Sequence, residues 1–374
     1  MSGMSGQWLG PYTGTNPGTL IIELDDMGTY YEGRTFAYDD NPAMPSTFAF
    51  IKTANKESAL HLDIRIYPID PGTGNPTTWD ELASRFSGIV FPTTASIDLN
   101  FTDTTLKVSW TTNIGTSGSA EITRKRADAP TDYQPLPEVT KWEEFKSYVC
   151  NLEHRRYIFL GQSKLLRLRT SFHRTGRADL GKFLDVDMRT LYRHLSLRTS
   201  HVFNRNLPDE NGAFFNLVQH HGYPTPLLDW TSSPFVAAFF AYHRFKNSEA
   251  ASADSGDKVR ILQFDQETWR SKFPQIHQLT WVKPHFSILE FIAVDNQRMI
   301  PQQSVSSVTN IDDIETYIRL LEPPEAPYLK IVDLPLNERP IVMKELSVMG
   351  ITAGSLFPGL DGTCEELRER FFEL

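Results

Sequence analysis

Short runs of alternating apolar and polar residues dominate the first third of the chain, residues 7–126, and this period of two is typical of β-strands. Clusters of Gly, Pro, Asn and Thr separate the runs and indicate tight turns. Many short strands joined by turns predict an antiparallel sandwich or barrel over residues 1–127. The clearest strand-like runs are Leu20–Leu24, Phe48–Ile51, Leu60–Ile66 and Leu106–Trp110.

A proline-rich segment, residues 128–139, marks a change of pattern, and we interpret it as a stiff linker because proline blocks helices and central strands. Thr140 and Glu143 then fit a capping box, so we expect a helix to begin near Lys141. In residues 140–374, helical and strand periods follow one another without regular alternation, which predicts a mixed α+β domain. Further helices are expected over 178–198, 211–220, 234–246, 340–349 and 361–372, and strands over 157–161, 259–264, 286–294 and 328–332.

Charge is distributed unevenly along this chain of 374 residues, whose net charge is −9. Residues 155–205 carry twelve Lys or Arg and only three acidic residues, Asp179, Asp185 and Asp187. A basic zone on an acidic protein suits an anionic ligand such as a phosphate, a nucleotide or a nucleic acid. An ordinary solvated helix surface would carry the same charges, so both interpretations stay open.

The two cysteines, Cys150 and Cys364, are far apart and lack metal-ligand spacing, which argues against a disulfide framework and a structural zinc site. We expect no metal. The N-terminus has no apolar signal-peptide core, and no uncharged apolar run is long enough for a membrane span. We therefore predict a cytoplasmic protein without membrane contact.

The most informative stretch is Gln219–Pro234, a polar segment between two apolar runs. His220 and His221 would point about 100° apart on a helix end, so only one can face a given ligand. Gly222 permits a sharp turn, and the prolines that follow predict a rigid extended loop. For Asp229 we favour a helix cap or an arginine pair over orientation of a histidine. A helix begins at Pro234, capped by Thr231 or Ser233.

Two further clusters carry candidate binding residues. Gln162 follows a predicted strand end, and Arg167, Arg169 and Arg174 come next, which suits a phosphate clamp. Pairing of these arginines with aspartates inside the fold is an equal alternative. The second cluster, residues 296–304, offers Arg298 and several amides for recognition of a base edge.

Glu290 lies in the expected strand 286–294, and a buried carboxylate needs a partner or a role. The chain contains no Walker loop, no Gly-x-Gly-x-x-Gly, no His-Glu-x-x-His and no Gly-x-Ser-x-Gly. Kinase, Rossmann oxidoreductase, zincin and α/β-hydrolase functions therefore lose support.

Several of these motifs together resemble the bacterial FRG-domain family, over about residues 140–374. The Gln219–Thr231 stretch is the longest and most specific match, and supporting matches are Phe159–Gln162, Arg167–Arg174, Asn296–Gln303 and Gly350–Gly362. The family is named for Phe-Arg-Gly, and here Leu160 stands in the place of that arginine. Any role of that arginine is therefore missing here or has moved to Arg167 or Arg169.

The resemblance implies an effector in a bacterial defence or toxin system, and the layout is also reminiscent of ADP-ribosyltransferase toxins, which bind NAD as a substrate. On this analogy we expect His220, His221, Glu290 and Gln303 to be catalytic. The expected substrate-binding residues are Gln162, Arg167, Arg169, Arg174, Gln219, Tyr223, Thr225, Trp230 and Arg298.

The implied partners are NAD or a nucleotide and a nucleic-acid or protein acceptor, while the β-rich domain would bind a protein or a second copy. A non-catalytic nucleotide or nucleic-acid recognition module is the main alternative, and a nuclease the third. The enzymatic hypothesis requires His220 or His221, Arg167 or Arg169, and Gln303 to meet in one pocket.

Overall fold

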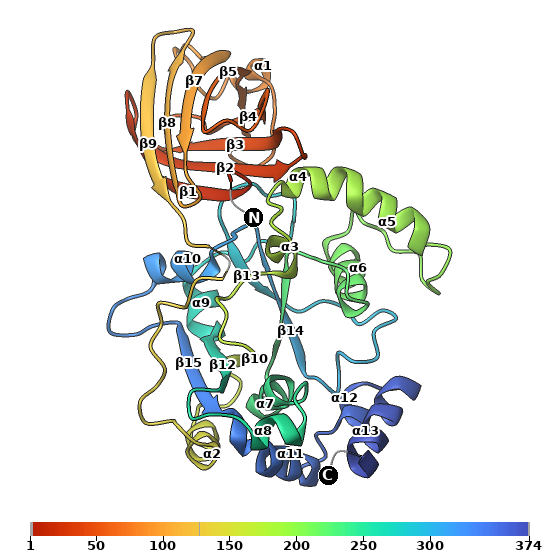
Figure 1. Ribbon diagram of the computed structural model, residues 1–374. Helices are drawn as coiled ribbons and strands as arrows, with labels where there is room; N and C mark the ends of the chain where they lie inside the picture. The colour runs from red at the N-terminus through yellow and green to blue at the C-terminus, as the bar shows by residue number, and fades with distance from the viewer. Residues whose placement is uncertain (1–2, 127, 373–374) are drawn as a thin grey trace.

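The computed structural model describes residues 3–126 and 128–372, which form a β-barrel followed by a mixed α/β region (Figure 1). The barrel confirms the predicted all-β N-terminal region and selects a barrel over a sandwich. Its strands are β1 (Gly6–Gly14), β2 (Gly18–Asp26), β3 (Tyr31–Asp39), β4 (Thr47–Lys52), β5 (Ala59–Arg65), β6 (Tyr67–Pro68), β7 (Thr94–Phe101), β8 (Thr105–Thr112) and β9 (Ser117–Thr123), with helix α1 (Trp79–Leu82) between β6 and β7.

The barrel is one nearly closed antiparallel sheet in the order β5-β7-β8-β9-β1-β2-β3-β4-β6. Alternation of buried and exposed residues is clear in β7 and β8, where one face of each strand points to the interior. Trp8 fills the interior near one end, and its indole nitrogen donates to the carbonyl oxygen of Met4 at 2.8 Å. The guanidinium of Arg124 covers the same ring at 3.8 Å.

The segment expected as a stiff linker, residues 128–139, is packed against the second region. Leu136 donates its backbone N–H to the carbonyl oxygen of Ile331, and Pro135 forms a parallel bridge with Ile331. Tyr133 is buried as well. Proline suits this position because it has no backbone N–H to donate, and a segment at the edge of a sheet has one side on which no donor is needed.

A second antiparallel sheet, in the order β13-β14-β11-β10-β12-β15, organises the C-terminal region. Apolar residues of both faces are buried, because α2, α7 and α11 cover one face and α9 and α10 the other. The strands are β10 (Tyr157–Gln162), β11 (Leu227–Thr231), β12 (Lys258–Asp265), β13 (Phe286–Leu289), β14 (Ser304–Thr309) and β15 (Leu329–Pro335).

The helices of this region are α2 (Trp142–Cys150), α3 (Ser171–Arg174), α4 (Leu180–Lys182), a π-helical turn (Phe183–Asp187), α5 (Met188–Leu195), α6 (Pro208–His220), α7 (Pro234–Tyr242), α8 (Asn247–Ala251), α9 (Gln266–Lys272), α10 (Ile314–Leu321), a 3-10 turn (Leu336–Glu338), α11 (Arg339–Val348), α12 (Ala353–Leu356) and α13 (Leu360–Phe372). The six expected helices are present with shifted ends, the one over 178–198 divided into α4, a π-helical turn and α5, whereas α3, α8, α9, α10 and α12 were not expected. The predicted capping box lies one residue later: Lys141 is the N-cap, and Glu144 accepts the backbone N–H groups of Thr140 and Lys141. None of the helices in the described residues is both long and apolar enough to cross a membrane.

Candidate functional site

The second sheet splits between β10 and β11, and this split creates the main cavity of the C-terminal region. The two strands share only one register pair, Phe159 with Thr231, whereas β10 pairs with β12 along its whole length. Beyond that pair the strands diverge, so Gly161, Gln162 and Asp229 face an opening rather than a neighbouring strand. Diverging strands leave polar groups available to a ligand in the middle of a fold.

This cavity has a volume of about 610 Å³, which is within the range of small-molecule sites. Strands β10, β11 and β14, helices α6 and α7 and the 296–302 loop contribute to its wall. The lining residues are Phe159–Lys164, Leu166, Arg174, Asn216, Gln219, His220, Asp229–Thr231, Phe240, Arg244, Asn296, Arg298, Met299, Gln302, Ser304 and Phe357.

Asp229 is the one carboxylate among the described residues that line the cavity. In β11 its neighbours Leu228 and Trp230 are buried in the core, so strand alternation turns the Asp229 side chain toward the cavity. The carboxylate is accessible from the cavity although protein surrounds it, and this desolvation raises its pKa. We expected a helix cap or an arginine pair here. Instead Ser233 caps α7, and no arginine pairs with Asp229 within the described residues.

Gln219 holds Asp229 in place. The Gln219 side chain is a hydrogen-bond partner of Asp229 and partly offsets the desolvation effect on its pKa. Its amide oxygen accepts a hydrogen bond from the Thr225 hydroxyl, which fixes which end of the amide faces Asp229. Thr225 is fully buried and outside the cavity, so its hydroxyl serves to position Gln219.

His220 reaches the cavity from the last turn of α6, on the same face as Asn216 and Gln219. Burial, together with the charge of Arg298, lowers the pKa of His220 to about 4. The imidazole is therefore neutral at pH 7 and can accept or donate a hydrogen bond without carrying charge. Gly222 ends α6 with a φ of 81°, the left-handed conformation that the sharp turn after the helix requires.

Four cations line the same cavity, and one of them, Arg298, acts on His220. Lys164, Arg174, Arg244 and Arg298 line the cavity, and within the part of the chain that the structure describes none of them forms an ion pair. Other arginines of this region do pair: Arg156 with Asp265 and Arg260 with Asp333, both at 2.7 Å. An excess of unpaired cations around a single carboxylate favours an anionic ligand.

Gln162 offers a further unsatisfied group. Its side-chain oxygen is buried and accepts no hydrogen bond from the described residues. Such an oxygen is costly unless a ligand or water donates to it. The preceding Gly161 is explained by packing, because a Cβ there would overlap with the backbone carbonyl oxygen of Ala237 in α7. Leu160, which stands in the place of the family's arginine, also borders the cavity. Strand β10 itself therefore contributes no cation to the cavity wall.

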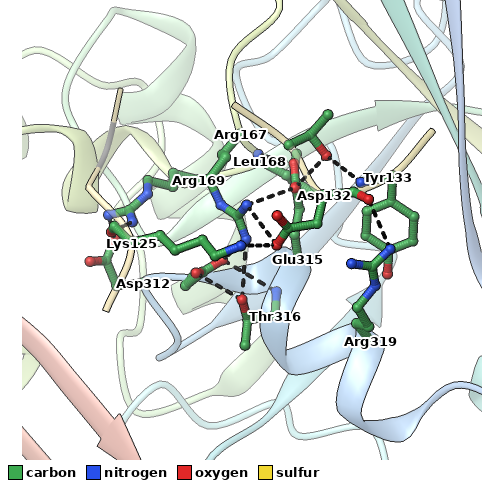
Figure 2. A network of polar contacts seen from close by, with 12 residues as sticks. Lys125, Asp132, Tyr133, Arg167, Leu168, Arg169, Asp312, Glu315, Thr316 and Arg319 are labelled. Atoms are coloured by element: carbon green, nitrogen blue, oxygen red, sulfur yellow. Dashed lines mark hydrogen bonds and ion pairs between the residues drawn. The ribbon is translucent and has the colours of Figure 1, made fainter. Parts of the chain in front are cut away.

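Arg167 and Arg169, expected as pyrophosphate ligands, are structural residues, because their guanidinium groups lie in a network of carboxylates (Figure 2). Arg167 is fully buried, and its Nη2 donates to Asp313 at 2.8 Å while Nη1 donates to Asp132 at 3.2 Å. Arg169 pairs with Asp312 at 2.5 Å. Neither lines the cavity, so the alternative of internal ion pairs holds for both, with partners other than those expected.

Three aromatic or histidine assignments also need correction. His221 is exposed at the end of α6, outside the cavity. Tyr223 packs on the apolar cluster around Phe183, with ring centres 6.4 Å apart. Trp230 borders the cavity, but its indole is only 2% exposed and donates to Ser307 at 2.9 Å in the core. None of the three can stack on a ligand in the cavity without leaving its place.

Glu290 and Gln303, expected to be catalytic, lie outside the cavity. The strand that we expected over 286–294 ends at Leu289, so Glu290 is exposed and pairs with Arg270 at 3.3 Å. Gln303 has a φ of 49° in a tight turn, and its side chain is exposed. The predicted meeting of His220, Arg167 or Arg169, and Gln303 therefore does not occur, so the enzymatic hypothesis fails with that set of residues and can rest only on other residues of the cavity. Gln162, Arg174, Gln219, His220 and Arg298 do meet in the cavity.

Among the described residues, no group of three or more His, Cys, Asp or Glu side chains could hold a metal ion.

Three charged residues that line the cavity were not among the expected site residues: Lys164, Asp229 and Arg244. For Asp229 the alternation in Leu227–Thr231 was a usable signal: Asp229 is the one polar residue between apolar neighbours in a short β-rich run.

Comparison with protein families shows that residues 155–250 match the family model of the FRG domain. The matched segment contains β10, α6, β11 and α7, and therefore Gln162, Arg174, Gln219, His220 and Asp229. Searches of curated proteins and of solved structures found no match to the chain.

Proposed function

We propose that this chain is an enzyme whose cavity at the β10–β11 split binds NAD or a related nucleotide and cleaves a bond beside Asp229. The observation that carries this proposal is a cavity lined by one carboxylate and by four cations that form no ion pair among the described residues. A nucleotide diphosphate supplies anionic oxygens for the cations and a neutral, polar ring for the amides. The cavity volume of about 610 Å³ accommodates a molecule of this size.

In this proposal the chain's residues divide into two roles. Arg174, Arg244, Arg298 and Lys164 bind the phosphate oxygens, and Gln162 accepts a hydrogen bond from the ligand. Asp229 faces the ribose and stabilises the positive charge that develops as the ribose–nicotinamide bond breaks. The bond's electron pair leaves with the nicotinamide nitrogen.

The second half of the reaction needs a base. Water or another acceptor then attacks the ribose carbon, and its proton passes to Asp229 or to the neutral imidazole of His220. The raised pKa of Asp229 makes this carboxylate a better base than an exposed one. Gln219 keeps it oriented throughout.

Release of nicotinamide from NAD by the purified full chain tests this proposal. We expect Asp229→Asn to lower the rate at least a hundredfold, in line with the loss of one electrostatic catalytic group. Glu290→Gln is the matched control, since Glu290 is an exposed carboxylate outside the cavity, and it should leave the rate unchanged. Release that is absent from the wild type, with or without nucleic-acid and protein acceptors, would contradict the proposal.

A second function, recognition of nucleic acid, is favoured by one observation on α5. Arg189, Arg193 and Arg198 are exposed on and just after this helix, and they form no ion pairs within the described ranges. Unpaired arginines along a helix supply the positive charge that binds nucleic-acid phosphates. Oligonucleotide affinity that falls steeply with salt and weakens on Arg193→Ala would support this function, and affinity independent of both would oppose it.

A biological setting in a bacterial defence or toxin system belongs to the same proposal. In that setting the barrel would recognise a protein partner or a second copy of the chain, and the C-terminal region would act on the nucleotide.

A further inference from the structure

A second cavity, of about 340 Å³, lies where the barrel meets the C-terminal region. The outer face of β2, β3 and β4 forms one wall, and α4 with the 279–282 segment forms the other. The two regions hold each other firmly here: Arg34 pairs with Asp179 at 3.2 Å, and the Tyr38 hydroxyl donates to the carbonyl oxygen of Val282 at 2.6 Å. The cavity is therefore a fixed feature of the interface.

Glu23 is the group in this cavity that the fold does not explain. It is 5% exposed, and one carboxyl oxygen accepts a hydrogen bond from Gln7 at 3.0 Å. The other oxygen accepts no hydrogen bond from the residues that the structure describes. Desolvation, reinforced by the charge of Asp179, raises the pKa of Glu23 to about 8. Glu23 is therefore a largely buried carboxyl with one oxygen open to the cavity, where a hydrogen-bond donor on a ligand can reach it.

Aromatic rings line the space next to Glu23. Phe36 and Phe48 are buried in the wall that the barrel forms, and Phe50 is 56% exposed. Trp281 belongs to the 279–282 segment of the other wall, where its indole also packs on Gly74. Aromatic rings in both walls favour a planar molecule, which can stack on them.

The charges exclude a phosphorylated ligand. Arg34 is the one cation among the described lining residues, and Asp179 and Asp185 already pair with it. Its guanidinium also covers the Phe50 ring at 5.4 Å. With Asp185 and Glu23 on the wall, a phosphate would meet carboxyl groups rather than free cations. The second cavity therefore suits a different class of ligand from the first cavity, whose cations favour an anion.

We propose that the cavity between barrel and C-terminal region is a binding site for an uncharged planar heterocycle with N–H donors, of purine nucleoside size. The heterocycle stacks between the phenylalanine cluster and Trp281, and its N–H edge donates to the free oxygen of Glu23. The protonated form of Glu23 can in addition donate to a ring nitrogen. This site does not depend on the function proposed for the first cavity.

Calorimetric titration of the full chain with adenosine and with guanosine tests this site, because neither probe carries a phosphate. We expect one binding site per chain for at least one of the two nucleosides. Glu23→Met keeps the side-chain volume, and Gln7 retains its bond to the carbonyl oxygen of Asn310, so the interface should persist. The Glu23→Met substitution should weaken nucleoside binding at least tenfold, since a site built for an N–H donor loses its acceptor.

Phe50→Ala is the second variant. Its ring is largely exposed, so folding should be unaffected, and the loss of stacking should weaken nucleoside binding roughly fivefold or more. Asp229→Asn, which alters the first cavity, should leave nucleoside affinity unchanged. Absence of saturable binding for both nucleosides overturns the proposal, as does binding that resists both Glu23→Met and Phe50→Ala, or that is lost in Asp229→Asn alone.

Discussion

Replacement of Arg167 by methionine separates a structural role from a ligand-binding role. The side chain is fully buried, and its donors reach Pro130, Asp132, Asp313 and Thr316. Figure 2 shows Asp132 and Thr316 beside it. Removing it leaves carboxylates without their cation, and breaking a buried pair costs about 3–5 kcal/mol. Asp132 and Asp313 are 33% and 22% exposed and can recover solvation, so we expect about 3 kcal/mol.

Urea denaturation followed by circular dichroism measures this loss in the free energy of unfolding. Arg298→Met is the matched control, because Arg298 lines the first cavity and has no ion pair among the described residues. Its stability should stay within about 0.5 kcal/mol of the wild type. An Arg167→Met protein as stable as the wild type, or an Arg298→Met protein that loses as much, would refute the division between structural and ligand-binding arginines.

Three further predictions concern the neighbours of the two cavities. Thr225→Val removes the hydroxyl that orients Gln219, so nicotinamide release should slow mainly through kcat while the KM for NAD changes little; an effect confined to KM would contradict a positioning role. Gly161→Ala should destabilise the chain by about 2 kcal/mol or more in urea, because the new methyl group overlaps with the α7 backbone, and unchanged stability would show that the two elements can separate. Glu23 has a folded-state pKa of about 8 against 4.5 for the unfolded chain, so its contribution to stability is complete below about pH 4.5 and is lost as pH rises to about 8; Glu23→Gln should remove this dependence, and an identical pH slope in the variant would oppose it.

Local patterns predicted most of the elements. The two-residue period identified the strand-rich barrel, and the polar interruption at Gln219–Pro234 directed attention to the wall of the cavity. These features depend on neighbouring residues, which a sequence displays directly. The helix that begins at Pro234 is an example, because Ser233 and Pro234 together specify its start.

The partners of the arginines could not be predicted, because they depend on distant contacts. Arg167 donates to Asp313, which is 146 positions away, and nothing local distinguishes it from Arg174 in the same basic zone. The ends of elements were hard to predict as well. Because strand β13 ends at Leu289, Glu290 lies at the surface and not in the core, where we expected it. Asp229 faces the cavity because β10 and β11 diverge, and divergence is a property of the assembled sheet.

The affinity of the full chain for NAD, compared between wild type and Arg244→Ala, tests most directly whether the unpaired cations of the first cavity bind the substrate. Arg244 makes no ion pair among the described residues, so its loss should spare the fold. We predict at least tenfold weaker binding by calorimetry, since a charge-assisted hydrogen bond contributes about 1.5–3 kcal/mol. Arg270→Ala, an arginine outside the cavity, should bind NAD as the wild type does. Equal affinities in wild type and Arg244→Ala, or an equal loss in Arg270→Ala, would contradict the account.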